Sequence, residues 1–409
     1  RRPPGYRLMK LLVLLVGWLL CPGVAAATPH WIGSWGASPE PPGPQAHSFS
    51  DQTVRQLVRI SAGGDRVRLR ISNAYGRRPL RIGSASVARL AGDGADLPGS
   101  LVPVTFSGRP GAIVRPGGTR LSDAVVMGAP ALSRLSVSLY VRGQTGPCTC
   151  HAIAVEEAYV SPPGDFTRRP FTPVETLTSR AFLTGVEVRP ARSGKVIVVL
   201  GDSLTDGFQS GLGADRRWPD RLAARLARER PDQAWGVVNA GISGNRLLGS
   251  GYGEAAPLRF GRDVLAVPGV AYVVVSLGLN DIRHSRIAGL PPPGVGDLVA
   301  ADRRMIAQAH ARGVRVIGAT LTPFEGESAY SPGGEAVRQA VNRWIRDGGE
   351  VDGGADFDAA WRDPGHPSRI RADLQAGDWL HGNDAGYAAL GDATGLSLFR
   401  SGRVSGRRD

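Results

Sequence analysis

The pattern of apolar and polar residues along the chain changes near residue 190. Between residues 53 and 160 the two kinds alternate, as in the segment 66–71, where arginines separate a valine, a leucine and an isoleucine. A period of two is typical of strands that bury one face against a core. We therefore expect an N-terminal all-β region of sandwich-like architecture, in which the glycine-containing segment 61–65 forms a hairpin turn.

After Lys195, short apolar runs alternate with amphipathic segments of helical period. Strands separated by helices pair in parallel through right-handed crossovers, which predicts an α/β domain. The expected strands lie at residues 196–200, 236–239, 271–277, 314–319 and 355–358. The expected helices lie at residues 219–230, 297–312, 335–346 and 384–399.

Length and composition agree with a chain of two domains. The 409 residues are 42% hydrophobic and 21% charged, which is ordinary for globular proteins. We place a β-rich domain with its linker at residues 28–190, an α/β domain at 191–400 and a basic tail at 401–409. The linker is the stretch rich in Pro, Thr and Arg at residues 161–192.

Residues 1–27 have the features of a signal peptide. Arg7 and Lys10 precede the apolar run 11–20, and Ala25–Ala27 offer a cleavage site of small residues. The apolar run is too short to cross a bilayer as a helix. We therefore expect export with cleavage at the alanines, a secreted or periplasmic protein, and no stable membrane insertion after cleavage.

The formal net charge of +13 comes almost entirely from arginine, because Lys10 and Lys195 are the only lysines. No run of basic residues is interleaved with aromatic ones, which argues against nucleic acid as a partner. A basic surface instead favours acidic surroundings, such as anionic polysaccharide or envelope lipid.

Cleavage would leave two cysteines, Cys148 and Cys150. In an oxidising compartment they can form a disulfide, although the single residue between them requires a tight loop. Free thiols are the alternative. His151 is the only metal ligand of the usual kind beside them, and one histidine is too few for a metal site.

Residues with a possible chemical role come shortly after three of the expected strands. Ser203 comes after the first strand, Gly244 after the second and Asn280 after the third. The carboxyl ends of parallel strands lie at one edge of a sheet, where ligands bind in this architecture. We therefore expect the three residues to lie close together.

These residue types suit nucleophilic catalysis at Ser203. A serine hydroxyl needs a general base, which His381 can supply. Asp378, three residues earlier, can hold the imidazole tautomer and stabilise the imidazolium. The backbone N–H groups of Ser203 and Gly244 and the side-chain amide of Asn280 can donate to the oxyanion of a tetrahedral intermediate.

Four motifs, read in order along the chain, resemble those of the SGNH/GDSL hydrolase family of esterases and lipases. They are GDSL at 201–204, ISGN at 242–245, GLND at 278–281 and DWLH at 378–381. The resemblance covers about residues 195–400 and assigns the five residues above the same roles. It implies a flavodoxin-like, three-layer α/β/α domain with a parallel sheet.

Two further segments bear on this resemblance. Many family members have proline where Gly382 stands, and this departure removes no catalytic group. The opening WIGSWGAS at Trp31–Ser38 is similar to that of secreted bacterial members with an N-terminal β-domain.

Other polar residues near the motifs have alternative interpretations. Asp363–His366 repeats the spacing of Asp378–His381, but it lies in a Pro- and Gly-rich loop, whereas an expected helix follows His381. Asp281 is expected to cap a helix or to accept structural hydrogen bonds. The candidates for lining the pocket are Asp202, Asn245 and His284. The histidines expected at surface or packing positions are His30, His47, His151 and His310.

The function predicted from these residues is a serine ester hydrolase that forms an acyl-enzyme on Ser203, with no metal and no organic cofactor. A metal-dependent phosphoesterase would want several histidines near the strand ends. The substrate stays open between short acyl esters, including acetyl groups on polysaccharide, and lipid esters; the β-domain favours carbohydrate. Two alternatives remain: acyl transfer to an alcohol, and a polysaccharide- or envelope-binding protein that acts through the β-domain.

Overall fold

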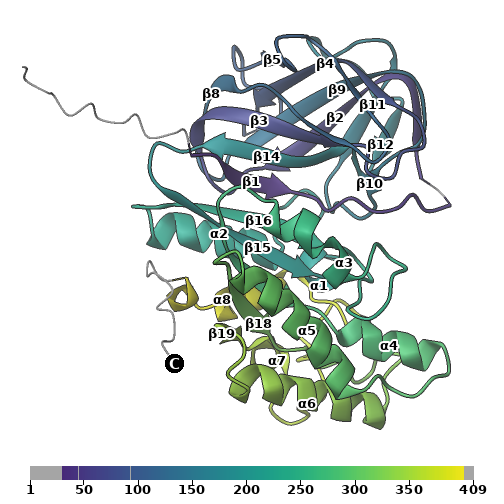
Figure 1. The fold of residues 1–409 in the computed structure, drawn as a ribbon, viewed down its shortest axis with the longest axis vertical. Coiled ribbons are helices and arrows are strands. Elements are labelled where there is room, and N and C mark those ends of the chain that lie inside the picture. The colour runs from purple at the N-terminus through teal and green to yellow at the C-terminus, as the bar shows by residue number, and fades with distance from the viewer. Residues whose placement is uncertain (1–29, 45, 93, 400–409) are drawn as a thin grey trace, which may run out of the picture.

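The computed structural model describes residues 30–44, 46–92 and 94–399. The expected signal peptide and the basic tail lie outside these ranges. The chain forms two stacked domains, a β-domain and an α/β domain, which meet along strands β1 (Ile32–Gly36) and β16 (Ala234–Gly241) (Figure 1). None of the helices within the described ranges is long and apolar enough to cross a membrane.

Two large antiparallel sheets, together with a small two-stranded one, build the β-domain. The first has five strands, which are β1, β14 (Leu183–Arg189), β3 (Gly64–Ser72), β7 (Thr119–Leu121) and, also paired with β3, β8 (Val125–Ala129). The second has seven strands, which are β12 (Glu175–Leu177), β11 (Ala158–Pro163), β2 (Ser48–Arg59), β9 (Arg134–Pro147), β4 (Leu80–Arg89), β5 (Val102–Val104) and, also paired with β4, β6 (Ala112–Val114).

The alternating sequence pattern explains how these sheets pack. On β3 the apolar Val67 and Leu69 are fully buried, while the arginines between them lie on the other face. Val137 and Leu139 on β9 are buried in the same hydrophobic core, which joins the two sheets. The predicted all-β region is confirmed.

The segment 61–65 does not form the expected hairpin turn. It leads from β2 in one sheet to β3 in the other, so the two strands do not pair. The Ser61 hydroxyl donates to the Ser34 carbonyl at 2.6 Å and accepts from the Val237 N–H at 2.8 Å. These bonds to β1 and β16 hold the segment at a corner between the sheets, which a turn-like composition does not reveal.

The stretch 161–192 is not a linker. β11 ends inside it, and β12, β13 (Arg180–Ala181) and β14 follow. β14 is an inner strand between β1 and β3, with Val186 and Val188 fully buried. Pro170 and Pro173 stand between β11 and β12, so composition averaged over the stretch conceals the short strands.

Five parallel strands form the sheet of the α/β domain. Their order is β16, β15 (Gly194–Gly201), β17 (Val270–Ser276), β18 (Arg315–Ala319) and β19 (Gly353–Ala355). Counted within the domain, this order is 2-1-3-4-5, that of a flavodoxin-like sheet. The expected fold class is therefore confirmed.

Helices cover both faces of this sheet. The face with Ile197 and Val199 packs against α2 (Trp218–Glu229), α7 (Phe357–Trp361) and α8 (Asp384–Ala393). The face with Val196 and Val198 packs against α3 (Ala256–Phe260), α4 (Leu279–Ile287), α5 (Val295–His310) and α6 (Pro332–Asp347). The result is the expected three-layer arrangement.

Expected and observed elements differ mainly at their ends. The last expected strand, 355–358, is β19, and it stops earlier because the Asp356 side chain accepts from the Ala359 N–H and starts α7. The last expected helix, 384–399, ends at Ala393. The helices α3, α4 and α7 were not predicted, because five to nine residues carry little helical periodicity.

The β-domain covers the edge strand of the parallel sheet. β16 lies at that edge, and Gly33 and Gly236 allow β1 to approach it closely, since a Cβ on Gly236 would lie 2.1 Å from the Gly33 carbonyl oxygen. The Gly33 N–H also donates to the Pro268 carbonyl at 2.9 Å. An open sheet edge can pair with other chains, so this contact shields a vulnerable strand.

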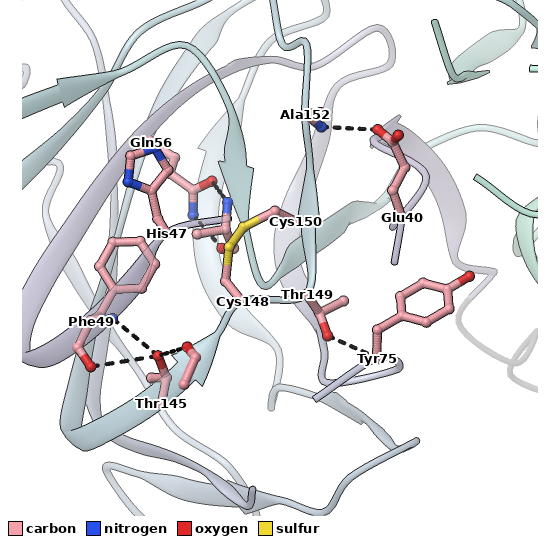
Figure 2. The surroundings of a disulfide bond; sticks show 12 residues. Glu40, His47, Phe49, Gln56, Tyr75, Thr145, Cys148, Thr149, Cys150 and Ala152 are labelled. Atoms are coloured by element: carbon pink, nitrogen blue, oxygen red, sulfur yellow. Dashed lines mark hydrogen bonds between the residues drawn. A yellow bond between two sulfur atoms is a disulfide. The ribbon is translucent and has the colours of Figure 1, made fainter. Parts of the chain in front are cut away.

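Cys148 and Cys150 are joined in a disulfide with their Cα atoms 5.4 Å apart (Figure 2). It links the end of β9 to the short strand β10 (Cys150–His151). The Cys150 carbonyl accepts from the Glu40 N–H at 2.8 Å, and the Thr149 hydroxyl accepts from the Tyr75 N–H at 3.0 Å. The disulfide thus lies in a hydrogen-bonded corner of the β-domain.

Candidate active site

The ends of β15, β16 and β17 bring the predicted site residues together. Gly201 at the end of β15 is in register with Gly241 on β16 and with Ser276 on β17. The segments that follow these three residues carry the predicted nucleophile and the other two oxyanion donors. Parallel pairing therefore places them at one edge, as expected.

Ser203 is the first residue of α1 (Ser203–Asp206), a single helical turn. Asp202 caps this turn by accepting from the Leu204 N–H at 3.1 Å. Gly201 is required just before it, because a Cβ there would lie 2.0 Å from the Thr205 hydroxyl. Ser203 therefore sits at a rigid turn between strand and helix, and only 8% of it is exposed.

His381 links Ser203 to Asp378. Its Nε2 atom lies 2.9 Å from Ser203 Oγ, and its Nδ1 atom lies 2.6 Å from Asp378 Oδ2. Asp378 Oδ1 also accepts from the backbone N–H groups of His381, at 2.8 Å, and Leu380, at 3.0 Å. A carboxylate only accepts, so Nδ1 carries a proton and Nε2 is free to take one from the serine.

The surroundings keep Asp378 ionised. Gln209 Nε2 donates to its Oδ2 atom at 2.9 Å, and the Phe208 ring packs edge-on against the His381 ring with centroids 4.8 Å apart. Burial opposes ionisation, but the hydrogen bonds from the His381 ring and from the backbone outweigh it and hold the pKa of Asp378 well below its usual range. Asp378 is therefore a permanent anion near neutral pH.

The predicted oxyanion donors gather beside Ser203. Asn280 Nδ2 lies 3.3 Å from Asp202 Oδ2 and 3.3 Å from the Asn245 carbonyl, next to Ser203 and Gly244 in sequence. Within the described ranges, the N–H groups of Ser203 and Gly244 have no acceptor. Both Asn280 bonds are long, so exchanging one for a bond to a charged oxyanion would be favourable.

Arg283 fixes the orientation of the Asn280 amide. Its Nη1 atom donates to Asn280 Oδ1 at 2.8 Å, and its Nη2 atom pairs with Glu327 Oε1 at 2.9 Å. With its oxygen engaged, Asn280 directs its NH₂ group toward Asp202 and the Asn245 carbonyl. Sequence reasoning missed Arg283, although a position three residues after Asn280 on one helix was a usable signal.

Arg259 on α3 ties the strand ends together and was also missed. Its fully buried guanidinium donates to the carbonyls of Gly201, at 3.3 Å, and Ala240, at 2.8 Å. It also donates to the Asn245 side chain at 2.9 Å and pairs with Asp263 at 3.0 Å. Arg259 therefore holds the loops after β15 and β16 in fixed relative positions.

The three side chains predicted to line the pocket have different surroundings. Asp202 lies within the site between Ser203 and Asn280, and burial raises its pKa to about 6. The Asn245 amide instead braces its own loop by donating to the carbonyls of residues 252 and 254, at 2.9 Å each. His284 is exposed on α4.

The expectations for Asp281 and for the choice between His366 and His381 agree with the structure. Asp281 is a structural acceptor, since it receives the N–H groups of Leu247 at 2.9 Å and Leu248 at 2.8 Å. His366 is exposed in its loop, and it is His381 that reaches the serine. Within the described ranges, no three His, Cys, Asp or Glu side chains are grouped as metal ligands.

Comparisons with known proteins concern the α/β domain. A sequence model of the GDSL-like lipase/acylhydrolase family matches residues 199–389. No curated protein sequence matches the chain.

Similar solved structures include Axe2, an acetylxylan esterase from Geobacillus stearothermophilus, with 22% identity and a TM-score of 0.40 over 53% of this chain and 99% of that one. LAE5, an alpha/beta hydrolase enzyme from the metagenome of Lake Arreo, has 20% identity and a TM-score of 0.40 over 51% of this chain and 95% of its own. A protein of the G-D-S-L family from Desulfitobacterium hafniense DCB-2 has 20% identity and a TM-score of 0.37 over 49% of this chain and 97% of its own.

The residues matched by the family model include Ser203, Gly244, Asn280, Asp378 and His381. Residues 199–389 are therefore a GDSL-like lipase/acylhydrolase domain.

Proposed function

We propose that this protein hydrolyses carboxylic esters through an acyl-enzyme on Ser203. The observation that carries the proposal is the chain of hydrogen bonds from Ser203 Oγ through His381, at 2.9 Å, to Asp378, at 2.6 Å. A serine, a base and an ionised orienting group in this order define a nucleophile ready to attack a carbonyl.

In the first half of the reaction, Ser203 Oγ attacks the ester carbonyl while His381 Nε2 takes the hydroxyl proton. Asp378 stabilises the imidazolium that forms. The carbonyl oxygen becomes an oxyanion, which the N–H groups of Ser203 and Gly244 and the Asn280 amide receive. Collapse of this intermediate breaks the ester C–O bond, and His381 protonates the departing alcohol.

In the second half, a water molecule attacks the acyl-enzyme. His381 takes its proton, the same donors hold the second oxyanion, and the acid leaves as Ser203 recovers its proton. An alcohol in place of water would give acyl transfer by the same steps. Product analysis in the presence of an added alcohol separates these two outcomes.

We also propose that the protein is exported to the periplasm or beyond. The signal-peptide pattern of residues 1–27 is the main support. The Cys148–Cys150 disulfide adds to it, because disulfides persist mainly in oxidising compartments. Protease accessibility of the protein in intact cells, compared with that of the same chain starting at residue 28, tests this point.

For the substrate we favour esters of short acyl groups, including acetyl groups on polysaccharide. Tyr252 is 72% exposed, and its ring lies against Gly244, since a Cβ on Gly244 would meet that ring at 2.7 Å. An exposed aromatic face beside the oxyanion donors suits stacking of a sugar ring. Lipid esters and a binding role for the β-domain are the competing candidates.

The test uses the chain from residue 28 with p-nitrophenyl esters from acetate to octanoate and with acetylated polysaccharides. We expect turnover that falls as the acyl chain lengthens, and none with Ser203→Ala. Unchanged activity in Ser203→Ala would refute the nucleophile. Retention of the inactive variant on an insoluble polysaccharide would favour the binding role, whereas turnover that rises with chain length would favour lipid esters.

A further inference from the structure

Asp206, at the end of α1, controls the loop that carries the oxyanion donor Gly244. Its Oδ2 atom accepts from the Ser243 N–H at 3.1 Å and from the Ser243 hydroxyl at 2.8 Å. Asp206 is almost fully buried. Because Ser243 immediately precedes Gly244, these two bonds set the direction of the next peptide N–H.

The partner of Asp206 comes from the β-domain. His151 on β10 places Nε2 2.8 Å from Asp206 Oδ1 and 2.9 Å from the Ile153 carbonyl. Its Nδ1 atom lies 3.0 Å from the Ser38 carbonyl. Carbonyl and carboxylate oxygens only accept hydrogen bonds, so both ring nitrogens must carry protons. The geometry therefore requires a buried imidazolium.

The charges around His151 agree with this protonation state. Burial disfavours the charged ring, but the attraction and hydrogen bond of Asp206, with the nearby Glu40, outweigh it and raise the pKa of His151 to about 9. Glu40 Oε1 lies 3.5 Å from Nδ1. The cation thus compensates buried carboxylates that would otherwise be costly.

The position of His151 is fixed by its own domain. β10 pairs with β13, so that Cys150 faces Ala181 and His151 faces Arg180. The disulfide closes the chain directly before His151, and the Ala152 N–H behind it donates to Glu40 at 2.9 Å (Figure 2). His151 therefore projects from a fixed strand of one domain into the catalytic loops of the other.

We propose that His151 is a positioning residue for the oxyanion hole: its imidazolium holds Asp206, and Asp206 holds Ser243 so that the Gly244 N–H faces the tetrahedral intermediate. This proposal rests on the ester hydrolase function proposed above. The β-domain then contributes a residue to catalysis, and the α/β domain alone has an incomplete oxyanion hole.

The first experiment compares His151→Ala with His47→Ala in the full chain, using p-nitrophenyl acetate. His47 is a matched control, because it also belongs to the β-domain and pairs with a carboxylate, Glu175 at 3.4 Å, but at the surface. We expect kcat to fall about 10- to 100-fold in His151→Ala, because small displacements of catalytic groups have effects of this size. KM should stay within about two-fold, since ground-state binding is not involved.

A double-mutant cycle tests whether His151 acts through Asp206. We expect Asp206→Asn to lower kcat by about 10-fold, and the double variant with His151→Ala to lose much less than the product of the two single losses. Multiplied losses would show that the residues act independently and would overturn the proposal.

Recovery of kcat on addition of imidazole distinguishes a positioning role of His151 from a purely structural one. The His151→Ala variant leaves a buried polar site next to Asp206, which imidazolium can fill. We expect imidazole to restore kcat in His151→Ala and to leave His47→Ala unchanged. If His151→Ala does not fold, His151→Gln, which keeps one donor for Asp206, takes its place in the kinetic comparison.

The two proposals fail in different ways. Equal activity of the unmodified chain and Ser203→Ala would refute the hydrolase mechanism itself. An active unmodified chain with unchanged kcat in folded His151→Ala would refute only the positioning role. The positioning role would also be refuted if His151→Ala were inactive only because it unfolds at the assay temperature. In that case its activity would return to that of the unmodified chain at a lower temperature.

Discussion

The histidine–aspartate pairs His381–Asp378 and His151–Asp206 differ in what the second ring nitrogen faces. In the pair of His381 and Asp378, Nε2 faces the Ser203 hydroxyl, which can donate or accept. In the pair of His151 and Asp206, the remaining nitrogen faces the Ser38 carbonyl at 3.0 Å and Glu40 Oε1 at 3.5 Å, which both accept hydrogen bonds. The first ring can therefore gain and lose a proton during a reaction, whereas the second stays a cation near neutral pH. One arrangement is suited to proton transfer and the other to holding a loop.

The largest effect expected is the loss of the base. His381→Ala should lower kcat/KM by about 10⁴- to 10⁶-fold, because the serine loses the base that accepts its proton. Steady-state kinetics with p-nitrophenyl acetate measures this loss. The matched control is His366→Ala, which removes the histidine of the second Asp-x-x-His segment and should leave the rate unchanged. A reversed result would move the base to His366.

The same substitution in both aspartates sharpens the comparison. Asp378→Asn should lower kcat by about 10³- to 10⁴-fold, because an amide can stabilise the wrong imidazole tautomer and cannot stabilise the imidazolium. Asp206→Asn should cost only about 10-fold, since it disturbs the position of one donor. Similar losses in the two variants would remove the distinction drawn between the pairs.

The two pairs also predict different responses of stability to pH. The pKa of His151 is raised from 6.5 to about 9, so the native state holds this proton more tightly than the unfolded chain does. The resulting stabilisation is complete below about pH 6.5 and is lost as the pH rises through about 9, a change of up to about 3 kcal/mol. Asp378 has a lowered pKa, so its contribution is lost only as the pH falls below the usual carboxylate range.

Urea unfolding of the unmodified chain and His151→Gln at pH 6.5, 8 and 10 measures this dependence. The variant should be less stable at pH 6.5, and the gap between the two proteins should narrow toward pH 10. A gap that stays constant or widens would contradict a buried imidazolium at position 151.

The smallest effect expected is that of the disulfide. Replacing Cys148 and Cys150 by serine opens a loop with one intervening residue, so the loop-entropy contribution is about 1–2 kcal/mol. Unfolding free energies of the double variant and of the unmodified chain should differ by this amount, and reductant should abolish the difference. A difference that persists in reductant would assign the effect to packing of the sulfur atoms instead.

The positions of the proposed catalytic residues could be predicted because the local sequence indicates the strands that they follow or the helix that comes after them. Ser203 closely follows the apolar run 196–200, and His381 precedes the helix α8. The contact between His151 and Asp206 could not be predicted in this way, since 55 residues and a domain boundary separate them. It depends on how β1 meets β16, and no local pattern encodes that.

The same limit explains the errors in the fold. The segment 61–65 has the glycines of a hairpin, but Ser61 bonds both β1 and β16, so long-range contacts determine its path. The strand β14 was hidden because proline and threonine dominate the composition before it. The period of the apolar residues predicted those elements that bury one face in the core of their own domain. It did not predict the path of segments that lie where the two domains meet.

The central claim is that Ser203 is the nucleophile of an ester hydrolase, and labelling with diethyl p-nitrophenyl phosphate tests it most directly. We expect one diethylphosphoryl group per chain, located on Ser203 by peptide mass spectrometry, with esterase activity lost in proportion to labelling. Ser203→Ala should take up no label. Label on another residue, or an active Ser203→Ala variant, would contradict the account.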